Sequence, residues 1–295
     1  MFAALFAWLL LPYGARVHAF ELHDFAWFPV WLRNHVTDIL RFSWCEPILG
    51  FVPIVSKVAS HLAPLFAARR VSTVLDLCSG GGGPVPRLLT ELRAAGLETK
   101  AVLTDLYPNE PAFRAAVAAA PRGALSYVPT SVDATACDPS KLVASSGSAD
   151  DKPIVCRTMF LSFHHMTPPL GTAILADAVA KNDMIAIFEL QHRAPLTLLV
   201  NLFLLFLLPY IALLTRKVGW EFSRVFFTLV VPVIPFVVAF DGLVSSLRTY
   251  SHDEMRALIR TADPHARFEW AIETRPAVHA WLPFVPLISC VGVPK

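Results

Sequence analysis

The sequence has little charge and no excess of one sign. Asp, Glu, Lys and Arg make up 16% of its 295 residues, and the formal net charge is +2. Typical soluble domains carry roughly a quarter charged residues. A nucleic-acid-binding surface needs clustered Lys and Arg, and no long basic run occurs. We therefore expect no nucleic-acid partner.

The sequence also lacks paired cysteines. Its five cysteines are scattered, and none forms a CxxC pair. An odd number of cysteines with mostly apolar neighbours predicts buried free thiols in a reducing compartment. No spacing of Cys and His predicts a metal site. The five are Cys45, Cys78, Cys137, Cys156 and Cys290.

Apolar residues are in excess, at 55% of the chain. Two runs, 194–215 and 226–240, contain no charged residue. At about 1.5 Å per residue the first run could nearly cross a hydrocarbon core of roughly 30 Å. The second run is shorter and is interrupted by Pro232 and Pro235, which break helical hydrogen bonding.

The linker between these runs contains Arg216, Lys217 and Arg224. A hairpin that spanned the membrane from a cytosolic domain would put these basic residues on the far side, against the positive-inside tendency. We therefore expect 194–244 to form a hairpin that enters one leaflet or lies in its interface, with the basic linker near the headgroups. A buried apolar lid or a dimer interface is the alternative.

The first 70 residues are apolar and aromatic. Residues 1–14 resemble the core of a signal peptide, but they lack a positively charged start and are too short to span a bilayer comfortably. Residues 31–40 have a helical pattern. We expect a helical extension near a substrate opening, and extra core helices that cap the sheet are an equal alternative.

From Val71 onward the pattern alternates between strands and helices, which argues for an α/β fold. Ser251 with Glu254 three residues later predicts a capped helix start. The expected strands are 73–77, 100–103, 125–128, 153–163, 184–189, 268–272 and 287–293, and the expected helices are 84–95, 111–120, 169–181 and 251–261. These elements predict one seven-stranded, mostly parallel sheet built from 71–193 and 245–295.

The first strand leads directly into four consecutive glycines, Gly80–Gly83, and a helical pattern follows. This order presents backbone N–H groups and a helix N-terminus to a bound cofactor. Glycine is needed there because a Cβ would clash in left-handed backbone and keep the ligand at a distance. We interpret this turn as the cofactor site.

The segment Asp76-Leu77-Cys78-Ser79-Gly80-Gly81-Gly82 resembles the first motif of class I S-adenosylmethionine-dependent methyltransferases, D/E-x-G-x-G-x-G, with Cys78 at the first glycine position. The G-x-G-x-x-G fingerprint of dinucleotide enzymes fits less well. The resemblance implies a Rossmann-like methyltransferase fold and S-adenosylmethionine as cofactor. The residues it assigns to cofactor binding in this motif are Asp76, Cys78, Gly80, Gly81 and Gly82.

Two aspartates extend this interpretation. Asp105 ends the second strand, where a carboxylate can accept hydrogen bonds from ribose hydroxyls, and a helix cap is the alternative. In the resembling family an Asp-Ala pair at the position of Asp133 and Ala134 reads the adenine amino group, and a plain turn is the alternative. Leu106 is assigned to the cofactor site with them.

His164 and His165 follow the fourth strand, at the edge where open parallel sheets bind ligands. Imidazole titrates near neutrality and can take a proton from an acceptor. On a continuing strand the two side chains point to opposite sides, so one faces the substrate. Glu189, at the end of the fifth strand, could balance the sulfonium charge or orient a base, or form a surface salt bridge. Arg248 could close over the substrate or act as an interfacial anchor.

Together these features predict a membrane-associated, S-adenosylmethionine-dependent methyltransferase with its catalytic domain facing the cytosol. Its acceptor is expected to be a lipophilic small molecule that reaches the site from membrane lipid. An inactive, membrane-bound scaffold is one alternative, since Cys78 departs from the motif. A nicotinamide-dependent oxidoreductase is another. The expected domains are 1–70, 71–193, 194–244 and 245–295.

Overall fold

The computed structural model describes residues 14–47, 51–143, 153–277 and 285–295. The described residues fall into two compact units. The helical unit takes its residues from Met1–Pro53, Glu189–Glu254 and Thr274–Ile288, and the sheet unit takes its residues from Ile54–Phe188, Met255–Glu273 and Ser289–Lys295. The apolar start of the chain, 1–13, lies outside the described residues.

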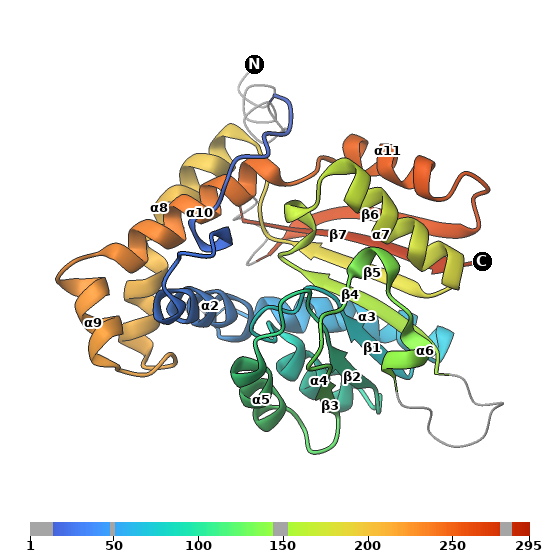
Figure 1. Ribbon diagram of the computed structural model, residues 1–295, viewed down its shortest axis with the longest axis horizontal. Helices are drawn as coiled ribbons and strands as arrows, with labels where there is room; N and C mark the ends of the chain where they lie inside the picture. The colour runs from blue at the N-terminus through green and yellow to red at the C-terminus, as the bar shows by residue number, and fades with distance from the viewer. Residues whose placement is uncertain (1–13, 48–50, 144–152, 278–284) are drawn as a thin grey trace. The chain divides into compact units, whose positions relative to one another are not determined.

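The strands form one seven-stranded sheet in the order β3-β2-β1-β4-β5-β7-β6 (Figure 1). β1 is parallel to both β2 and β4, β2 to β3, and β4 to β5. This confirms the predicted seven-stranded, mostly parallel sheet. The strands are β1 Thr73–Asp76, β2 Lys100–Leu103, β3 Leu125–Tyr127, β4 Val155–Phe160, β5 Met184–Glu189, β6 Phe268–Pro276 and β7 Pro286–Pro294.

The strand order reverses between β1 and β4. The chain moves outward from β1 through β2 to β3 and then returns to β4 on the other side of β1. In open parallel sheets a ligand binds beyond the carboxyl ends of the strands at such a reversal. β1 and β5 are buried at every position, as expected for strands covered on both faces.

Helices alternate with these strands, and their start signals agree with the sequence. Asn109 caps α5 by accepting a hydrogen bond from Ala112 N. Ser251 and Glu254 form the expected capping box, with each backbone N–H donating to the other side chain. The helices are α3 Ile54–Arg69, α4 Val85–Ala94, α5 Glu110–Ala119, α6 Pro139–Leu142, α7 Pro168–Lys181 and α11 His252–Ala262, with short 3₁₀ turns η3 Ala134–Ala136 and η4 Phe163–His165.

The helical unit contains η1 Leu22–Asp24, α2 Val30–Cys45, α8 Pro195–Thr215, α9 Phe222–Leu229 and α10 Val233–Arg248 (Figure 1). α2 packs against both α8 and α10. The apolar residues buried at this junction are Phe28, Leu32, Val36, Ile39, Phe42, Leu208, Ala212, Val218, Ile234, Val237 and Val238.

Among the described residues α8 is long and apolar enough to cross a membrane. α9 and α10 together reach the same length and composition, but they are bent by 73° at the break between them. Pro232 lies in this break and caps α10. A proline cannot supply the backbone N–H that would continue α9 into α10.

Of the basic linker expected near lipid headgroups, Arg224 does not face outward. Its side chain is buried, and its guanidinium contacts Asp38 Oδ2 at 2.5 Å and His35 Nδ1 at 3.1 Å, both on α2. A buried guanidinium needs such a partner. Arg248 is also buried and paired, with Glu21 and Asp24, so it is not an interfacial anchor.

Candidate functional site

The turn between β1 and α4 has left-handed backbone at four positions. The φ angles are 55° at Cys78, 53° at Gly80, 86° at Gly82 and 46° at Gly83. Leu77 N donates to Thr158 O on β4, and Ser79 N donates to Thr104 O after β2. The turn is therefore tied to the ends of both strands that flank β1.

The glycines of this turn have two different functions. A Cβ on Gly82 would lie 2.7 Å from Ala116 Cβ, so this glycine lets the turn pack against α5. A Cβ on Gly80 or Gly83 would meet no described atom within 4 Å. The backbone at Gly80 and Gly83 thus borders open space, as a cradle for a ligand requires.

Cys78, at the position of the motif's first glycine, takes a left-handed conformation. For a residue with a side chain this conformation costs about 1–2 kcal/mol. Burial raises the pKa of the Cys78 thiol to about 12, and the nearby carboxylates of Asp105, Asp76 and Asp133 add to the shift. The thiol is therefore neutral at physiological pH and is not a nucleophile. All five cysteines are free thiols, as expected, but only three of them are buried: Cys137, Cys156 and Cys290.

Asp76 is buried at the end of β1. Thr158, its register partner on β4, donates a hydrogen bond from Oγ1 to Asp76 Oδ1 at 2.6 Å. Burial raises the pKa of Asp76 to about 7, with a further contribution from the charge of Asp105, while the hydrogen bond from Thr158 opposes the shift. This carboxyl is therefore close to half ionised at neutral pH.

Asp105 joins the glycine turn to the end of β2. Its Oδ2 accepts a hydrogen bond from Gly80 N at 2.8 Å, and its Oδ1 accepts one from Tyr107 N at 2.9 Å. The helix-cap alternative is wrong, because Asn109 caps the following helix. Leu106, next to Asp105, is exposed. The carboxylate thus sits directly beside the glycine cradle.

Asp133 forms a turn, which is the alternative that the sequence left open for it. Its Oδ1 accepts hydrogen bonds from Thr135 N at 2.8 Å and Thr135 Oγ1 at 2.7 Å, and these bonds lower the pKa of Asp133. The neighbouring Ala134 is buried. The assignment of Asp133 and Ala134 to the adenine stays a prediction.

A buried arginine holds this turn in place. Arg157 on β4 donates from Nη2 to Cys137 O at 3.1 Å, directly after η3. It also contacts Asp183 at 2.6 Å and Asp177 at 2.6 Å. Arg157, Thr158 and Thr104 are not among the residues that the sequence predicts for the site. An Arg inside an apolar strand pattern was the available signal for the first of them, because a buried charge needs partners.

The histidines do not lie on a strand. β4 ends at Phe160, since Leu161 has a left-handed φ of 49°, and His164 and His165 lie in η4. The expectation that they point to opposite sides of a strand is therefore wrong. Their rings lie together, with centroids 4.3 Å apart; His164 is buried and His165 half-buried. The pair still follows the carboxyl end of β4.

Glu189 is the last residue of β5 and is buried. Glu189 therefore does not lie on the surface. Further along, burial lowers the pKa of His192 to about 4, and His252 and Arg193 add to this shift. His192 is neutral at physiological pH.

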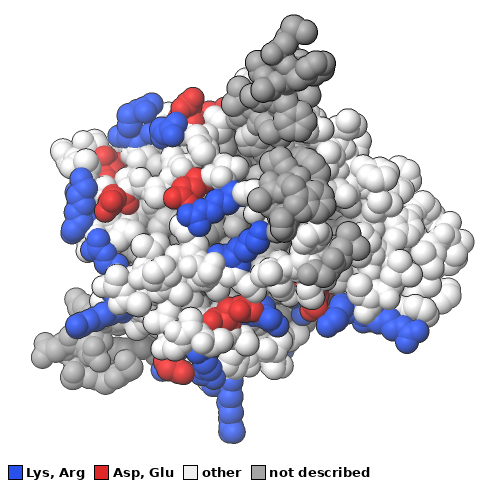
Figure 2. Space-filling model, turned by 180° about the vertical axis from the view of Figure 1, so that it is seen from behind, with Lys and Arg blue, Asp and Glu red and all other residues white. Residues whose placement is uncertain are grey.

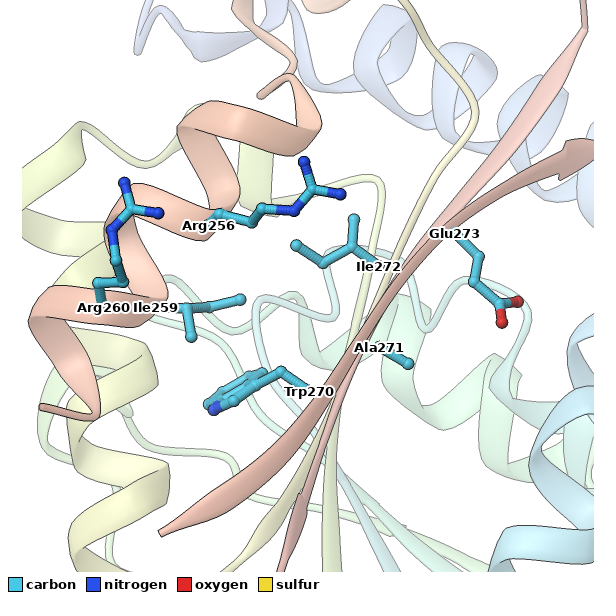
Figure 3. A pocket seen from close by; sticks show the side chains of 7 residues that line it. All are labelled: Arg256, Ile259, Arg260, Trp270, Ala271, Ile272 and Glu273. Carbon is cyan, nitrogen blue, oxygen red and sulfur yellow. The ribbon is translucent and has the colours of Figure 1, made fainter. Parts of the chain in front are cut away.

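A separate hollow lies in the sheet unit between α11 and β6, with a volume of about 480 Å³. Figure 3 shows Arg256 and Arg260 extending from α11 and Ile259 pointing into the hollow above Trp270. The indole Nε1 of Trp270 donates to Asp263 Oδ2 at 3.1 Å, which fixes the ring. None of the predicted site residues lines this hollow, which lies on the edge strand farthest from β3.

Comparisons with known proteins agree on the fold. No family model and no curated protein matches the chain. Among solved structures, the CMeT domain of the citrinin polyketide synthase matches 93% of this chain and 59% of its own, at 12% identity and a TM-score of 0.50. An O-methyltransferase family protein from Burkholderia thailandensis matches 81% and 55%, at 12% identity and a TM-score of 0.44.

A DUF574 family protein from Streptomyces avermitilis matches 97% of this chain and 98% of its own, at 14% identity and a TM-score of 0.48. The chain thus spans little more than half the length of the first two structures. With the strand order and the glycine turn, the match to the CMeT domain identifies the fold. The chain has the Rossmann-like fold of the S-adenosylmethionine-dependent methyltransferases.

Proposed function

We propose that this protein is an S-adenosylmethionine-dependent methyltransferase that works at a membrane on a lipophilic acceptor. The observation that carries the proposal is the junction of Asp105 with Gly80 at the carboxyl end of β1. It lies next to the reversal of strand order, where this kind of sheet binds its ligands.

The residues present fit the cofactor. The open space beside Gly80 and Gly83 leaves room for a ligand to approach the backbone. The Asp105 carboxylate retains acceptor capacity beyond its two backbone donors and suits ribose hydroxyls. Bound there, S-adenosylmethionine supplies an electrophilic methyl group.

The chain's own contribution to methyl transfer is mainly alignment and exclusion of water. His164 and His165 are proposed to take the acceptor's proton, because neutral imidazole is a suitable base near pH 7. Glu189, buried at the end of β5, is proposed to orient that base. Asp76 is proposed to support the turn from beneath, through its contact with Thr158.

A lipophilic acceptor is supported by the apolar character of α8, α9 and α10. These helices follow β5, whose carboxyl end belongs to the edge at which such sheets bind ligands. An acceptor dissolved in lipid would match this apolar character. The catalytic domain is proposed to face the cytosol.

The test is transfer of a labelled methyl group from S-adenosylmethionine into a lipid extract by the full chain. We expect label in the organic phase with the parent chain, and less label with Asp105→Ala when the cofactor concentration is below saturation. Label only in water-soluble products would overturn the lipophilic acceptor. Cofactor binding without any transfer would favour the inactive scaffold that Cys78 suggests.

A further inference from the structure

The helices α8, α9 and α10 turn their charged residues inward. α8 has no charged residue, and the charged residues of α9 and α10 are Arg224, Asp241 and Arg248. All three are buried. In a helical protein surrounded by water, charged side chains lie on the outer face instead.

Each of these charges meets a partner inside the unit. Asp241 accepts hydrogen bonds from Leu22 N at 2.6 Å and from His23 Nδ1 at 2.9 Å. Arg248 contacts Glu21 Oε1 at 3.0 Å and Asp24 Oδ2 at 2.8 Å. These pairs fasten η1 to the inner face of α10.

Arg224 is held in the same way on α9, by its contacts with Asp38 and His35 of α2. His35 Nε2 also lies 2.9 Å from Ser223 Oγ. Desolvation together with the Arg224 charge lowers the pKa of His35, so this ring is neutral. The polar contacts of the hairpin are therefore directed toward α2 and η1.

The outward surface is apolar by contrast. Phe203 and Phe236 are 64% and 63% exposed, and Phe206 joins their helices by an edge contact with Phe236 at 5.4 Å between ring centroids. Phe240 continues this surface to Phe20, at 5.9 Å. The exposed large apolar residues of the three helices are Leu199, Leu202, Phe203, Leu204, Leu214, Phe222, Leu229, Phe236 and Phe240.

The described residues of the sheet unit form no comparable surface. Of the large apolar side chains exposed in the described residues, only Leu106, Tyr107, Ile154 and Leu170 belong to it. Figure 2 shows the contrast, with the side that carries the hairpin almost entirely white and Lys or Arg side chains at its lower border. Exposed apolar surface of this extent marks an interaction site.

We propose that the outer face of α8, α9 and α10 is a membrane-contact surface that lies in one leaflet of the bilayer. The residues at its border fit this partner. The Arg216 guanidinium lies 5.0 Å from the Trp220 ring centroid, and Lys217 is exposed. Indole and basic side chains together favour anionic headgroups over the surface of a second protein copy.

The contacts of α2 with the hairpin argue against a hairpin that spans the bilayer. α8 extends about 31 Å, long enough to cross. However, Lys217 pairs with Glu46 at 3.1 Å and Arg224 pairs with Asp38. A spanning hairpin would carry Asp38 of α2, and Glu46 directly after it, through the hydrocarbon. The surface therefore lies along the interface.

This assignment extends the membrane association of the proposed function to a defined surface, and it does not depend on methyl transfer. The test is flotation of the full chain with vesicles of phosphatidylcholine and phosphatidylglycerol. We expect the parent chain to float, and Phe203→Glu and Phe236→Glu each to lower the bound fraction roughly tenfold. Leu170→Glu and Ile154→Glu, on exposed residues of the sheet unit, are matched controls and should float like the parent.

Three outcomes overturn the assignment. The parent chain could fail to float, or the two Phe variants could float like the parent. Alternatively, the parent could be a dimer that these variants dissociate, without vesicle binding, which would make a second copy the partner. Circular dichroism of each variant shows whether it is still folded. S-adenosylmethionine binding of each variant tests the proposed function separately from membrane binding.

A second measurement tests whether the hairpin lies in one leaflet or spans the bilayer. Thr215→Cys places a thiol at the exposed end of α8. On vesicles, an impermeant maleimide added outside should label it above the background of the parent chain. Protection of this thiol until the vesicles are lysed would show a spanning hairpin and overturn the in-plane arrangement.

Discussion

The carboxylate of Asp105 accepts a hydrogen bond from the backbone N–H of Gly80, 25 residues earlier in the chain, at 2.8 Å. This bond joins the end of β2 to the left-handed turn that follows β1. It holds a negative charge beside the open backbone of the cradle. The site proposed here depends on that junction.

Asp105→Ala should weaken S-adenosylmethionine binding by about 1–3 kcal/mol, the cost of leaving charge-assisted hydrogen bonds unmade. Isothermal calorimetry measures the change. Asp138→Ala is the control, because Asp138 also accepts from a nearby backbone N–H but caps α6. Equal affinities for the parent chain and Asp105→Ala would remove Asp105 from the site.

Gly82→Ala should destabilise the fold more than Gly80→Ala. Both residues have positive φ, which costs about 1–2 kcal/mol with a side chain, but only the Cβ at position 82 would lie 2.7 Å from Ala116 Cβ. Urea denaturation measures the difference. Gly123→Ala, at a φ of 73° with open space around it, calibrates the cost of the backbone alone. Equal losses for Gly82→Ala and Gly123→Ala would mean that the turn does not pack on α5.

Asp76→Asn should flatten the pH dependence of stability. The folded pKa of about 7 lies above the ordinary value of 3.8, so the folded state holds an extra proton between these values. The free energy of unfolding therefore falls as pH rises from about 4 to 7, by up to about 4 kcal/mol at roughly 1.4 kcal/mol per pKa unit. An amide stays neutral and still accepts from Thr158. Denaturation of both proteins at pH 5 and pH 7.5 checks this, and parallel pH profiles would contradict it.

Arg157→Met should cost about 3–5 kcal/mol of folding stability, because it leaves Asp177 and Asp183 without their buried partner. Arg114→Met removes an exposed pair with Glu110 and should cost less than about 1 kcal/mol. Thermal unfolding compares the two variants. Similar losses of stability in the two variants would show that solvent screens the ion pairs of Arg157 with Asp177 and Asp183.

His164→Gln and His165→Gln test the proposed base. If one histidine takes the acceptor's proton, its variant should lose roughly 10²–10⁴-fold in turnover while cofactor affinity stays unchanged. Single-turnover assays with labelled cofactor separate these two quantities. Full turnover in both variants would show that neither histidine is the base. The chain would then contribute to catalysis by aligning the acceptor with the cofactor.

The sequence predicted the sheet well because its strands are continuous apolar runs between turn signals. The bounds of β2 and β5 match the expected ones. β4 is shorter than expected, since the apolar pattern continues through Phe163 while the backbone turns at Leu161. The hydrophobic pattern of a sequence does not show where a single residue takes a left-handed conformation. The left-handed Leu161 ends the strand, and both histidines therefore lie in η4.

Long-range pairing accounts for the other differences. Asp38 and Arg224 are 186 residues apart, so the pattern around Arg224 could not show that the residue is buried. The same holds for Arg248 and Glu21, which are 227 residues apart. Local composition identified the apolar hairpin, but only the tertiary contacts reveal that its charges face inward.

The central claim is that the glycine turn binds S-adenosylmethionine, and calorimetric titration of the purified chain tests it most directly. We predict saturable one-to-one binding of S-adenosylmethionine, weakened in Asp105→Ala, and no binding of nicotinamide dinucleotides. Binding of a nicotinamide dinucleotide alone, or of neither molecule, would contradict the account.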